Sequence, residues 1–416
     1  MSKVGFGAYR ISTRSDEHRE ALKAALIAGV TLIDTSSNYT DGESEKLIGE
    51  VIKELDRKPF LISKVGYIQG ENLEVIKKLN EAGKAIEDLV VISDNLKHSI
   101  HPDFIEDQIQ RTLKRLDVKS IDAYLLHNPE YYLKTEGSSK EEYYKRIKKA
   151  FDKMEDLVDR GLINSYGISS NTFVDPKDDH ESTDLDIVIG AARSVRKNHS
   201  LKYIQFPMNV LEMGALERQY EGDHLIERAQ TFGLKTIINR PLNCFTEQGL
   251  LRLATYKVDE KYTDKKNADK IFNDCIQPLV IKWIEAREDA GDKLFDIPLM
   301  KQITEIWYKQ NSKDAVDQVF QQYFFPLIAN IWGGDLSVKD SQKFYDLYDH
   351  ALEFAKANMN ERAIQFEQQA IDKGLLFESE LSLSQKVIEK YQGFGVDYIL
   401  VGMRKVDYVT DLKKYF

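Results

Sequence analysis

This chain of 416 residues is poor in cysteine and has no excess of basic residues. It contains only two cysteines, Cys244 and Cys275. Two thiols are too few for a disulfide framework or a four-thiolate zinc site, so we expect both to stay reduced and no metal to be bound. Lys and Arg number 58 against 68 Asp and Glu, which gives a net charge of −10. Because neutralising phosphates requires a basic surface, no nucleic-acid partner is expected.

Long apolar runs are missing as well. No run approaches the roughly 20 residues that a membrane-spanning helix needs. The first residues, MSKVGFGAYR, contain no apolar segment of the signal-peptide kind. We therefore expect a cytoplasmic protein with no membrane partner. Apolar residues make up 42% of the chain and charged residues 30%, a balance typical of folded globular proteins.

What the sequence does contain is a regular alternation of short β-rich runs and longer helical patterns. Strands are predicted at Val4–Tyr9, Thr31–Asp34, Phe60–Lys64, Ile121–Leu126, Ser165–Ser169, Tyr203–Phe206, Lys235–Asn239 and Tyr398–Val401. Helices are predicted at Asp16–Ala28, Glu43–Leu55, Pro102–Leu116, Glu141–Arg160, Asp184–Lys197 and Leu225–Thr231. A doubly wound sheet would also alternate in this way. The count of eight strands, with polar residues at their carboxyl ends, favours a (β/α)₈ TIM barrel.

One stretch interrupts the alternation. From about residue 246 to 381 the sequence shows only helical patterns, at Ala268–Ala286, Met300–Lys309, Val316–Ile328, Ser341–Ala357 and Glu361–Lys373. Ordinary connections are ~2–6 residues long, so we predict a large helical insertion after strand seven. The chain then divides into a first barrel part (1–245), the insertion (246–381) and the completion of the barrel (382–416). We expect the insertion to cap the substrate pocket, the alternative being a surface for homo-oligomer formation.

Four polar side chains stand at the ends of consecutive predicted strands. Asp34 ends the second strand, Tyr39 follows five residues later, Lys64 ends the third strand and His127 follows the fourth. A phenol with an ordinary pKa near ~10 is a poor acid at neutral pH. A neighbouring ammonium is expected to lower that pKa, and a carboxylate keeps the ammonium charged. With an imidazole to hydrogen-bond a carbonyl, the four groups form a site that protonates a carbonyl oxygen.

The segments LIDTSSNYTDGESEKLIGEVI, ISKVG, IDAYLLHNP and YGISSN resemble the aldo-keto reductases in order and position. The resemblance covers roughly residues 4–245 and 382–416. It implies that Tyr39 is the general acid in reduction and the general base in oxidation. It further implies that Lys64 lowers the pKa of Tyr39, that Asp34 supports Lys64, and that His127 orients the carbonyl of a small-molecule carbonyl or alcohol substrate.

The same resemblance implies a nicotinamide cofactor across the barrel mouth. Ser169 and Ser170, or Asn171 in place of the latter, occupy the position that holds the carboxamide, with Gln205 completing that contact. A helix cap is the alternative role for these serine and asparagine residues. The remaining cofactor contacts implied are Asn239, Arg240, Leu242, Gly402, Arg404 and Lys405. The basic pair in LVGMRKVDYV favours NADP(H) over NAD(H), because it can meet a 2′-phosphate.

One departure from the family pattern concerns the end of strand seven. The family usually places an aromatic residue there, which stacks on the nicotinamide, whereas this chain has Asn239 followed by Arg240. The resemblance thus implies an NAD(P)H-dependent oxidoreductase acting on an aldehyde, ketone or sugar-type alcohol. The alternative is a non-catalytic, regulatory barrel that binds the cofactor and, through its helical insertion, a partner protein.

Overall fold

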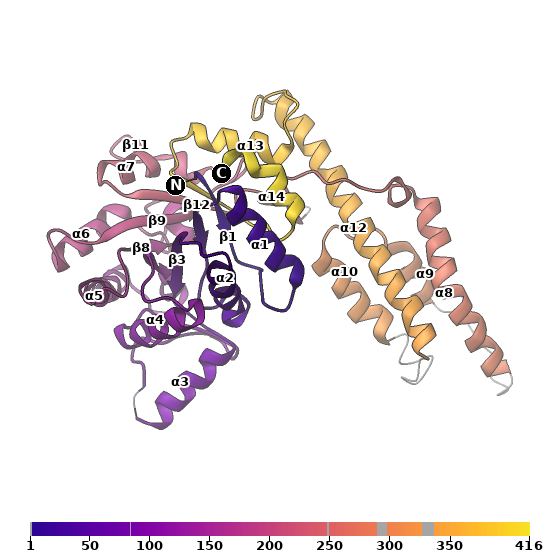
Figure 1. Ribbon diagram of the computed structural model, residues 1–416, viewed down its shortest axis with the longest axis horizontal. Helices are drawn as coiled ribbons and strands as arrows, with labels where there is room; N and C mark the ends of the chain where they lie inside the picture. Colours follow the sequence, from indigo (N-terminus) through magenta and orange to yellow (C-terminus); the bar gives the residue numbers. More distant parts are fainter. Residues whose placement is uncertain (1, 84, 248, 289–297, 327–336) are drawn as a thin grey trace. The chain divides into compact units, whose positions relative to one another are not determined.

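The computed structural model describes residues 2–83, 85–247, 249–288, 298–326 and 337–416. The chain divides into two compact units. The first comprises Met1–Cys244 together with Ser384–Phe416, and the second comprises Phe245–Leu383. The first unit is a barrel and the second is built mainly from helices (Figure 1). Among the described residues, no helix is long and apolar enough to cross a membrane.

The barrel is closed by eight strands, all paired in parallel. In chain order they are β1 (Val4–Gly7), β2 (Leu32–Asp34), β3 (Phe60–Val65), β7 (Ala123–His127), β8 (Tyr166–Ser169), β9 (Leu201–Pro207), β12 (Lys235–Asn239) and β15 (Tyr398–Val401). Each strand pairs with its neighbours in this order, and β1 pairs with β15 to complete the circle. The predicted TIM barrel is confirmed.

A layer of buried side chains fills part of the barrel unit. It consists of Leu32, Ile62, Ala123, Leu125, Tyr203, Ile237, Tyr398 and Leu400. The strand β8 contributes Gly167 beside this layer, where a Cβ would lie 2.3 Å from Tyr203 O and 2.6 Å from Leu125 Cδ2. No side chain fits there without displacing the backbone of β9. The barrel therefore has a packed interior rather than a channel, as this fold requires.

Helices surround the strands (Figure 1). They are α1 (Asp16–Ala28), α2 (Glu43–Glu54), α4 (Pro102–Leu116), α5 (Lys140–Asp159), α6 (Leu185–Val195), α7 (Leu225–Thr231), α13 (Leu383–Gly393) and α14 (Val406–Leu412). Their ends follow from sequence. For α1, the Ser15 side chain accepts a hydrogen bond from His18 N, and Gly29 ends the helix at φ 115°, a left-handed conformation that glycine adopts without a Cβ penalty.

The connection between β3 and α4, for which no elements were predicted, has its own small structure. It contains β4 (Tyr67–Ile68), α3 (Glu71–Glu81), β5 (Val90–Ser93) and β6 (Leu96–His98). The three strands form an antiparallel sheet in the order β4-β6-β5. A second unpredicted hairpin, β10 (Arg218–Tyr220) with β11 (Asp223–His224), precedes α7. Both follow barrel strands, so they add backbone at the carboxyl ends of β3 and β9.

The helical unit contains α8 (Lys265–Glu288), α9 (Pro298–Ile306), α10 (Lys313–Val319) and α12 (Val338–Asp372). A π-helix, Phe320–Phe324, continues α10, and the last two residues of the predicted Val316–Ile328 helix lie outside the described residues. Trp307, Phe320, Phe344 and Phe354 belong to the unit's own apolar core, where α8 and α10 pack against α12. These four aromatic residues are therefore packing groups.

Two details of the predicted insertion are wrong. Residues beyond 246 are not only helical, because β13 (Asn243–Thr246) and β14 (Gly249–Arg252) form a two-stranded sheet. The helices predicted at Ser341–Ala357 and Glu361–Lys373 are one continuous helix, α12. Asparagine usually interrupts helices by bonding its own backbone. Here Asn358 Nδ2 donates to Tyr308 O at 2.8 Å, and Asn360 Oδ1 accepts from Tyr256 N at 2.7 Å. These amides are satisfied elsewhere, so the helix continues.

Candidate active site

Three of the four predicted catalytic residues stand at the carboxyl ends of adjacent strands. Asp34 is the last residue of β2, Lys64 is the penultimate residue of β3, and His127 is the last residue of β7. These strands pair β2 with β3 and β3 with β7. Tyr39 begins a 3₁₀ turn, Tyr39–Gly42, five residues after β2 ends. The barrel thus brings the four side chains to one mouth.

Lys64 is the centre of this group. Its side chain is 0% exposed. Nζ donates to Asp34 Oδ1 at 2.5 Å, to Thr35 O at 2.9 Å and to Tyr39 Oη at 3.2 Å. An ammonium has three protons, so the protein uses every one of them. A buried ammonium needs such partners, because removing it from water without compensation is costly.

Burial controls the protonation of the group. It lowers the pKa of Lys64 and raises that of Asp34, and the contact between the two opposite charges opposes both shifts. Burial also raises the pKa of Tyr39 well above its ordinary value, with the Asp34 charge as the second cause. The Lys64 ammonium that contacts the phenol is also hydrogen-bonded to Asp34. The prediction that Lys64 lowers the pKa of Tyr39 stays a prediction. Tyr39 is held protonated at neutral pH.

His127 is held by its backbone and by its Nδ1 atom. Ser36 Oγ lies 3.1 Å from Nδ1, and His98 Nε2 donates to the backbone oxygen of His127 at 2.7 Å. Burial lowers the pKa of His127 well below its ordinary value, and Lys64 adds to that shift. The ring is therefore a neutral imidazole at neutral pH. Nδ1 is engaged by Ser36, and Nε2 has no hydrogen-bond partner among the described residues.

The predicted carboxamide-binding residues continue the same network. Ser169, the last residue of β8, donates from Oγ to Gln205 Oε1 at 2.9 Å. Gln205 Nε2 then donates to Asp34 Oδ2 at 2.8 Å. One hydrogen-bonded chain therefore runs from Ser169 through Gln205, Asp34 and Lys64 to Tyr39. The link between Gln205 and Asp34 was not predicted, because residues 171 positions apart share no local sequence signal.

Ser170 and Asn171 have structural partners. Ser170 caps the 3₁₀ turn Asn171–Val174, since its Oγ accepts from Thr172 N at 3.2 Å. This is the capping role that the sequence left open for it. Asn171 Oδ1 accepts from Arg240 Nη2 at 2.8 Å. The role of Arg240 as a cofactor contact, implied by the resemblance, stays a prediction.

Asn239 ends β12 at the position where an aromatic residue was expected from the resemblance. Its Oδ1 is buried and has no hydrogen-bond partner among the described residues. Arg240 follows at φ 55°, a left-handed conformation that is strained for a residue with a side chain. Asn128, directly after β7, also has a positive φ of 51°. Leu242 is half-buried two residues after Arg240. Strained backbone therefore occurs at two of the strand ends around the mouth.

The predicted 2′-phosphate residues lie outside the Ser169–Tyr39 network. Gly402, Arg404 and Lys405 follow β15, and Lys405 is the N-cap residue of α14. Lys405 Nζ lies 3.2 Å from Glu17 Oε1. Burial lowers the pKa of His18, and the charge of Arg404 lowers it further. The basic pair therefore stands beside the first turn of α1, where Glu17 and His18 lie.

Sequence reasoning missed several residues around the four predicted ones. Tyr9 is 60% exposed and its ring centroid lies 5.0 Å from that of Tyr39. The ring of Tyr67 packs edge-on against His127 at 4.7 Å, and its Oη accepts from Asn128 Nδ2 at 2.6 Å. Tyr9 and Tyr67 each follow a barrel strand by two residues. A position at or just after the end of a strand was the signal that identified the first four residues. Tyr9 and Tyr67 carry the same signal.

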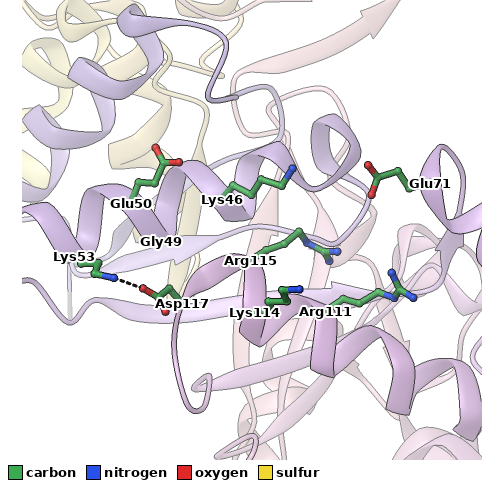
Figure 2. Close-up of a pocket in the computed structure, with 9 residues that line it drawn as sticks. All are labelled: Lys46, Gly49, Glu50, Lys53, Glu71, Arg111, Lys114, Arg115 and Asp117. Atoms are coloured by element: carbon green, nitrogen blue, oxygen red, sulfur yellow. Dashed lines mark hydrogen bonds and ion pairs between the residues drawn. The ribbon is translucent and has the colours of Figure 1, made fainter.

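A groove of about 420 Å³ lies elsewhere on the barrel, between α2 and α4 (Figure 2). It is lined by Lys46, Gly49, Glu50, Lys53, Glu71, Arg111, Lys114, Arg115 and Asp117. None of these is a predicted site residue. Lys53 pairs with Asp117 at 2.5 Å, and Arg115 pairs with the buried Glu45 at 2.6 Å. The groove is best described as a solvated, charged helix surface. Among the described residues, no cluster of His, Cys, Asp and Glu can hold a metal ion.

Comparison with known families assigns the chain. A sequence model described as the aldo/keto reductase family matches residues 3–299, more than half of the chain. The chain belongs to the aldo/keto reductase family. Members of this family are oxidoreductases. The match extends into the helical unit and stops short of residues 382–416, although β15 from that segment closes the barrel.

Individual relatives are more distant. The aldo-keto reductase YhdN of Bacillus subtilis is 25% identical over 176 residues, which cover 41% of this chain and 43% of that protein. Aldo-keto reductase family 1 member A1 of Rattus norvegicus is 30% identical over 184 residues, covering 41% and 46%. The chain thus matches less than half the length of these relatives. A glycerol dehydrogenase structure from Gluconobacter oxydans has a TM-score of 0.50 at 17% identity and covers 100% of this chain and 86% of that one. That likeness supports the fold.

Proposed function

We propose that this member of the aldo/keto reductase family is an NADP(H)-dependent oxidoreductase that interconverts a small aldehyde or ketone and the corresponding alcohol. The observation that carries the proposal is the fully buried Lys64, which bonds Asp34 and Tyr39 at the barrel mouth. Burying an ammonium beside a phenol has a cost that packing alone does not explain. Perturbed groups gathered in this way are typical of active sites.

The residues at the mouth fit a nicotinamide cofactor. Asn239 Oδ1 and Ser37 Oγ are buried polar atoms with no partner among the described residues, and a carboxamide offers both a donor and an acceptor. Ser169 and Gln205 would hold that group beside Asp34, and Arg240 is the candidate for the pyrophosphate. Arg404 and Lys405 favour NADP(H) over NAD(H), because a 2′-phosphate supplies the anion that a basic pair binds. The chemistry that such a cofactor supplies when bound is hydride donation to the carbonyl carbon, or hydride acceptance in oxidation.

The chain's own residues handle the proton. In reduction, Tyr39 Oη donates its proton to the carbonyl oxygen as negative charge develops there. The Lys64 ammonium, 3.2 Å away, stabilises the phenolate that remains. Asp34 keeps Lys64 charged and oriented. The neutral His127 ring hydrogen-bonds the same carbonyl oxygen from Nε2, held in place by Ser36 at Nδ1. Oxidation uses the same groups in reverse.

The experiment is to incubate the purified protein with NADPH and a panel of small aldehydes and ketones, following absorbance at the wavelength of the reduced nicotinamide. We expect consumption of NADPH with at least one carbonyl, and faster consumption with NADPH than with NADH. Binding of NADPH without turnover of any carbonyl or alcohol would favour the non-catalytic, regulatory barrel. Formation of a homo-oligomer through the helical unit stays a prediction, which light scattering measures directly.

A further inference from the structure

One buried carboxylate at the barrel mouth has no part in the proposed chemistry. Glu130 lies in the 3₁₀ turn Pro129–Lys134, three residues after His127, and is 2% exposed. Its Oε1 accepts a hydrogen bond from Asn171 N at 2.9 Å. Its Oε2 is buried and has no hydrogen-bond partner among the described residues. A side chain from the loop after β7 therefore holds the loop after β8.

Asn171 is held at a second point by its side chain. Arg240 Nη2 donates to Asn171 Oδ1 at 2.8 Å. A guanidinium has only donors, so the oxygen of the amide must face Arg240 and the Nδ2 group must face away from it. The described residues offer no acceptor to that Nδ2 group. Asn171 therefore has an unused amide donor in the loop that follows Ser169, the proposed carboxamide ligand.

We propose that Glu130 and Arg240 are positioning residues that fix Asn171 so that its Nδ2 donates to the carboxamide oxygen of the nicotinamide. This inference rests on the proposed function. Three loops, following β7, β8 and β12, are tied together by the two bonds to Asn171. An amide side chain in a loop that is free to change rotamer loses conformational entropy when a ligand binds, which weakens binding. A side chain that is already fixed does not lose that entropy on binding. Arg240 makes this bond from a left-handed backbone conformation, φ 55°.

The bond to Asn171 needs an acceptor at the position of Glu130 Oε1 and does not need a charge. An amide oxygen accepts a hydrogen bond as a carboxylate oxygen does, so Glu130→Gln keeps the contact and Glu130→Ala removes it. Glu155 provides a matched control. It is also 2% exposed and accepts from a backbone amide, Ser200 N, at 2.6 Å. Ser200 directly precedes β9, so Glu155 lies at the opposite, amino end of the strands.

Two ligands separate positioning from general damage. NADPH contains the nicotinamide, whereas 2′-phosphoadenosine 5′-diphosphoribose lacks it and keeps the rest of the oxidised cofactor. We expect Glu130→Ala to weaken NADPH binding about tenfold, the loss for one hydrogen bond, and to leave the Kd of the fragment within about twofold. Glu130→Gln should restore NADPH binding, and Glu155→Ala should change neither Kd.

A double-mutant cycle tests the link between the two residues. If Glu130 acts through Asn171, the pair Glu130→Ala and Asn171→Ala should weaken NADPH binding no more than either change alone. Equal losses for NADPH and the fragment, or additive losses in the cycle, would overturn the inference and leave Glu130 a structural residue. Failure of the unaltered protein to bind NADPH or NADH would overturn the proposed function itself. The two failures are therefore distinguishable.

Discussion

Replacing Glu130 by Gln should make the stability of the barrel less sensitive to pH. Burial raises the pKa of Glu130 from 4.5 to about 7. The backbone N–H groups of Asn171 and of Glu130 itself oppose the shift only in part, as do the Ser170 hydroxyl and the Lys134 charge. A raised carboxyl pKa means that the folded state holds the proton more tightly than the unfolded state. The contribution of Glu130 to the free energy of unfolding is therefore fully present below about pH 4.5. It falls as the pH rises and is lost above about pH 7.

The magnitude follows from the shift. Moving a pKa from 4.5 to about 7 corresponds to about 3 kcal/mol of free energy of unfolding at pH 8, since one unit is about 1.4 kcal/mol. The Gln side chain cannot ionise. We therefore compare the free energy of unfolding of Glu130→Gln with that of the unaltered protein at pH 5 and at pH 8. The difference should move by about 2–3 kcal/mol in favour of the variant between these two pH values.

The assay must report on the barrel. Trp283, Trp307 and Trp332 all belong to the sequence of the helical unit, so tryptophan fluorescence would follow that unit instead. Hydrogen exchange of peptides from β7 and β8, measured by mass spectrometry across urea concentrations, reads the barrel directly. A difference between variant and unaltered protein that stays constant from pH 5 to pH 8 would refute the reasoning, because Glu130 would then titrate alike in both states.

Glu106 offers a control of opposite sign. A hydrogen bond from Arg160 lowers the pKa of Glu106 to about 2, and Arg160 donates to both of its oxygens at 2.6 and 2.7 Å. Stability from this pair is present above pH 4.5 and is lost as the pH falls toward 2. Raising the pH should therefore shift the free energy of unfolding of Glu106→Gln against the variant relative to the unaltered protein, whereas it shifts that of Glu130→Gln in favour of the variant.

Three further changes test the proposed function. Tyr39→Phe should lower turnover by roughly 10²-fold or more, the range for a lost general acid. The Kd of NADPH, measured by fluorescence, should stay within a few-fold, because Phe keeps the ring packing. Turnover close to that of the unaltered protein would mean that the proton comes from another group. Arg404→Ala should weaken NADPH far more than NADH in fluorescence titrations, because only NADPH carries the 2′-phosphate; equal losses would assign Arg404 to structure. Replacing residues 246–381 by a short Gly/Ser linker should leave cofactor binding largely unchanged and should broaden or abolish substrate selectivity in the carbonyl panel. An unchanged substrate profile in a folded variant would favour a role of this segment in assembly.

The sequence by itself determined the barrel and its four polar side chains. Hydrophobic runs and caps are local signals, so eight strands and the helices between them were predicted within a few residues. Placing Asp34, Lys64 and His127 at strand ends was enough to put them together, because parallel strands of a closed barrel all end at one mouth. The continuous helix α12 escaped prediction, because its Asn358 and Asn360 are satisfied by residues 50 and 104 positions away.

Only the tertiary structure decided how these groups act on one another. The contacts of Gln205 with Asp34 and of Arg240 with Asn171 join residues from different strands, and no periodicity or motif encodes such pairs. Burial decided the protonation of Tyr39, because desolvation and the nearby Asp34 charge both raise the pKa of its phenol. Both effects depend on which atoms surround a group in space. A sequence names the groups, and the folded chain sets the distances and the exclusion of water that determine their chemistry.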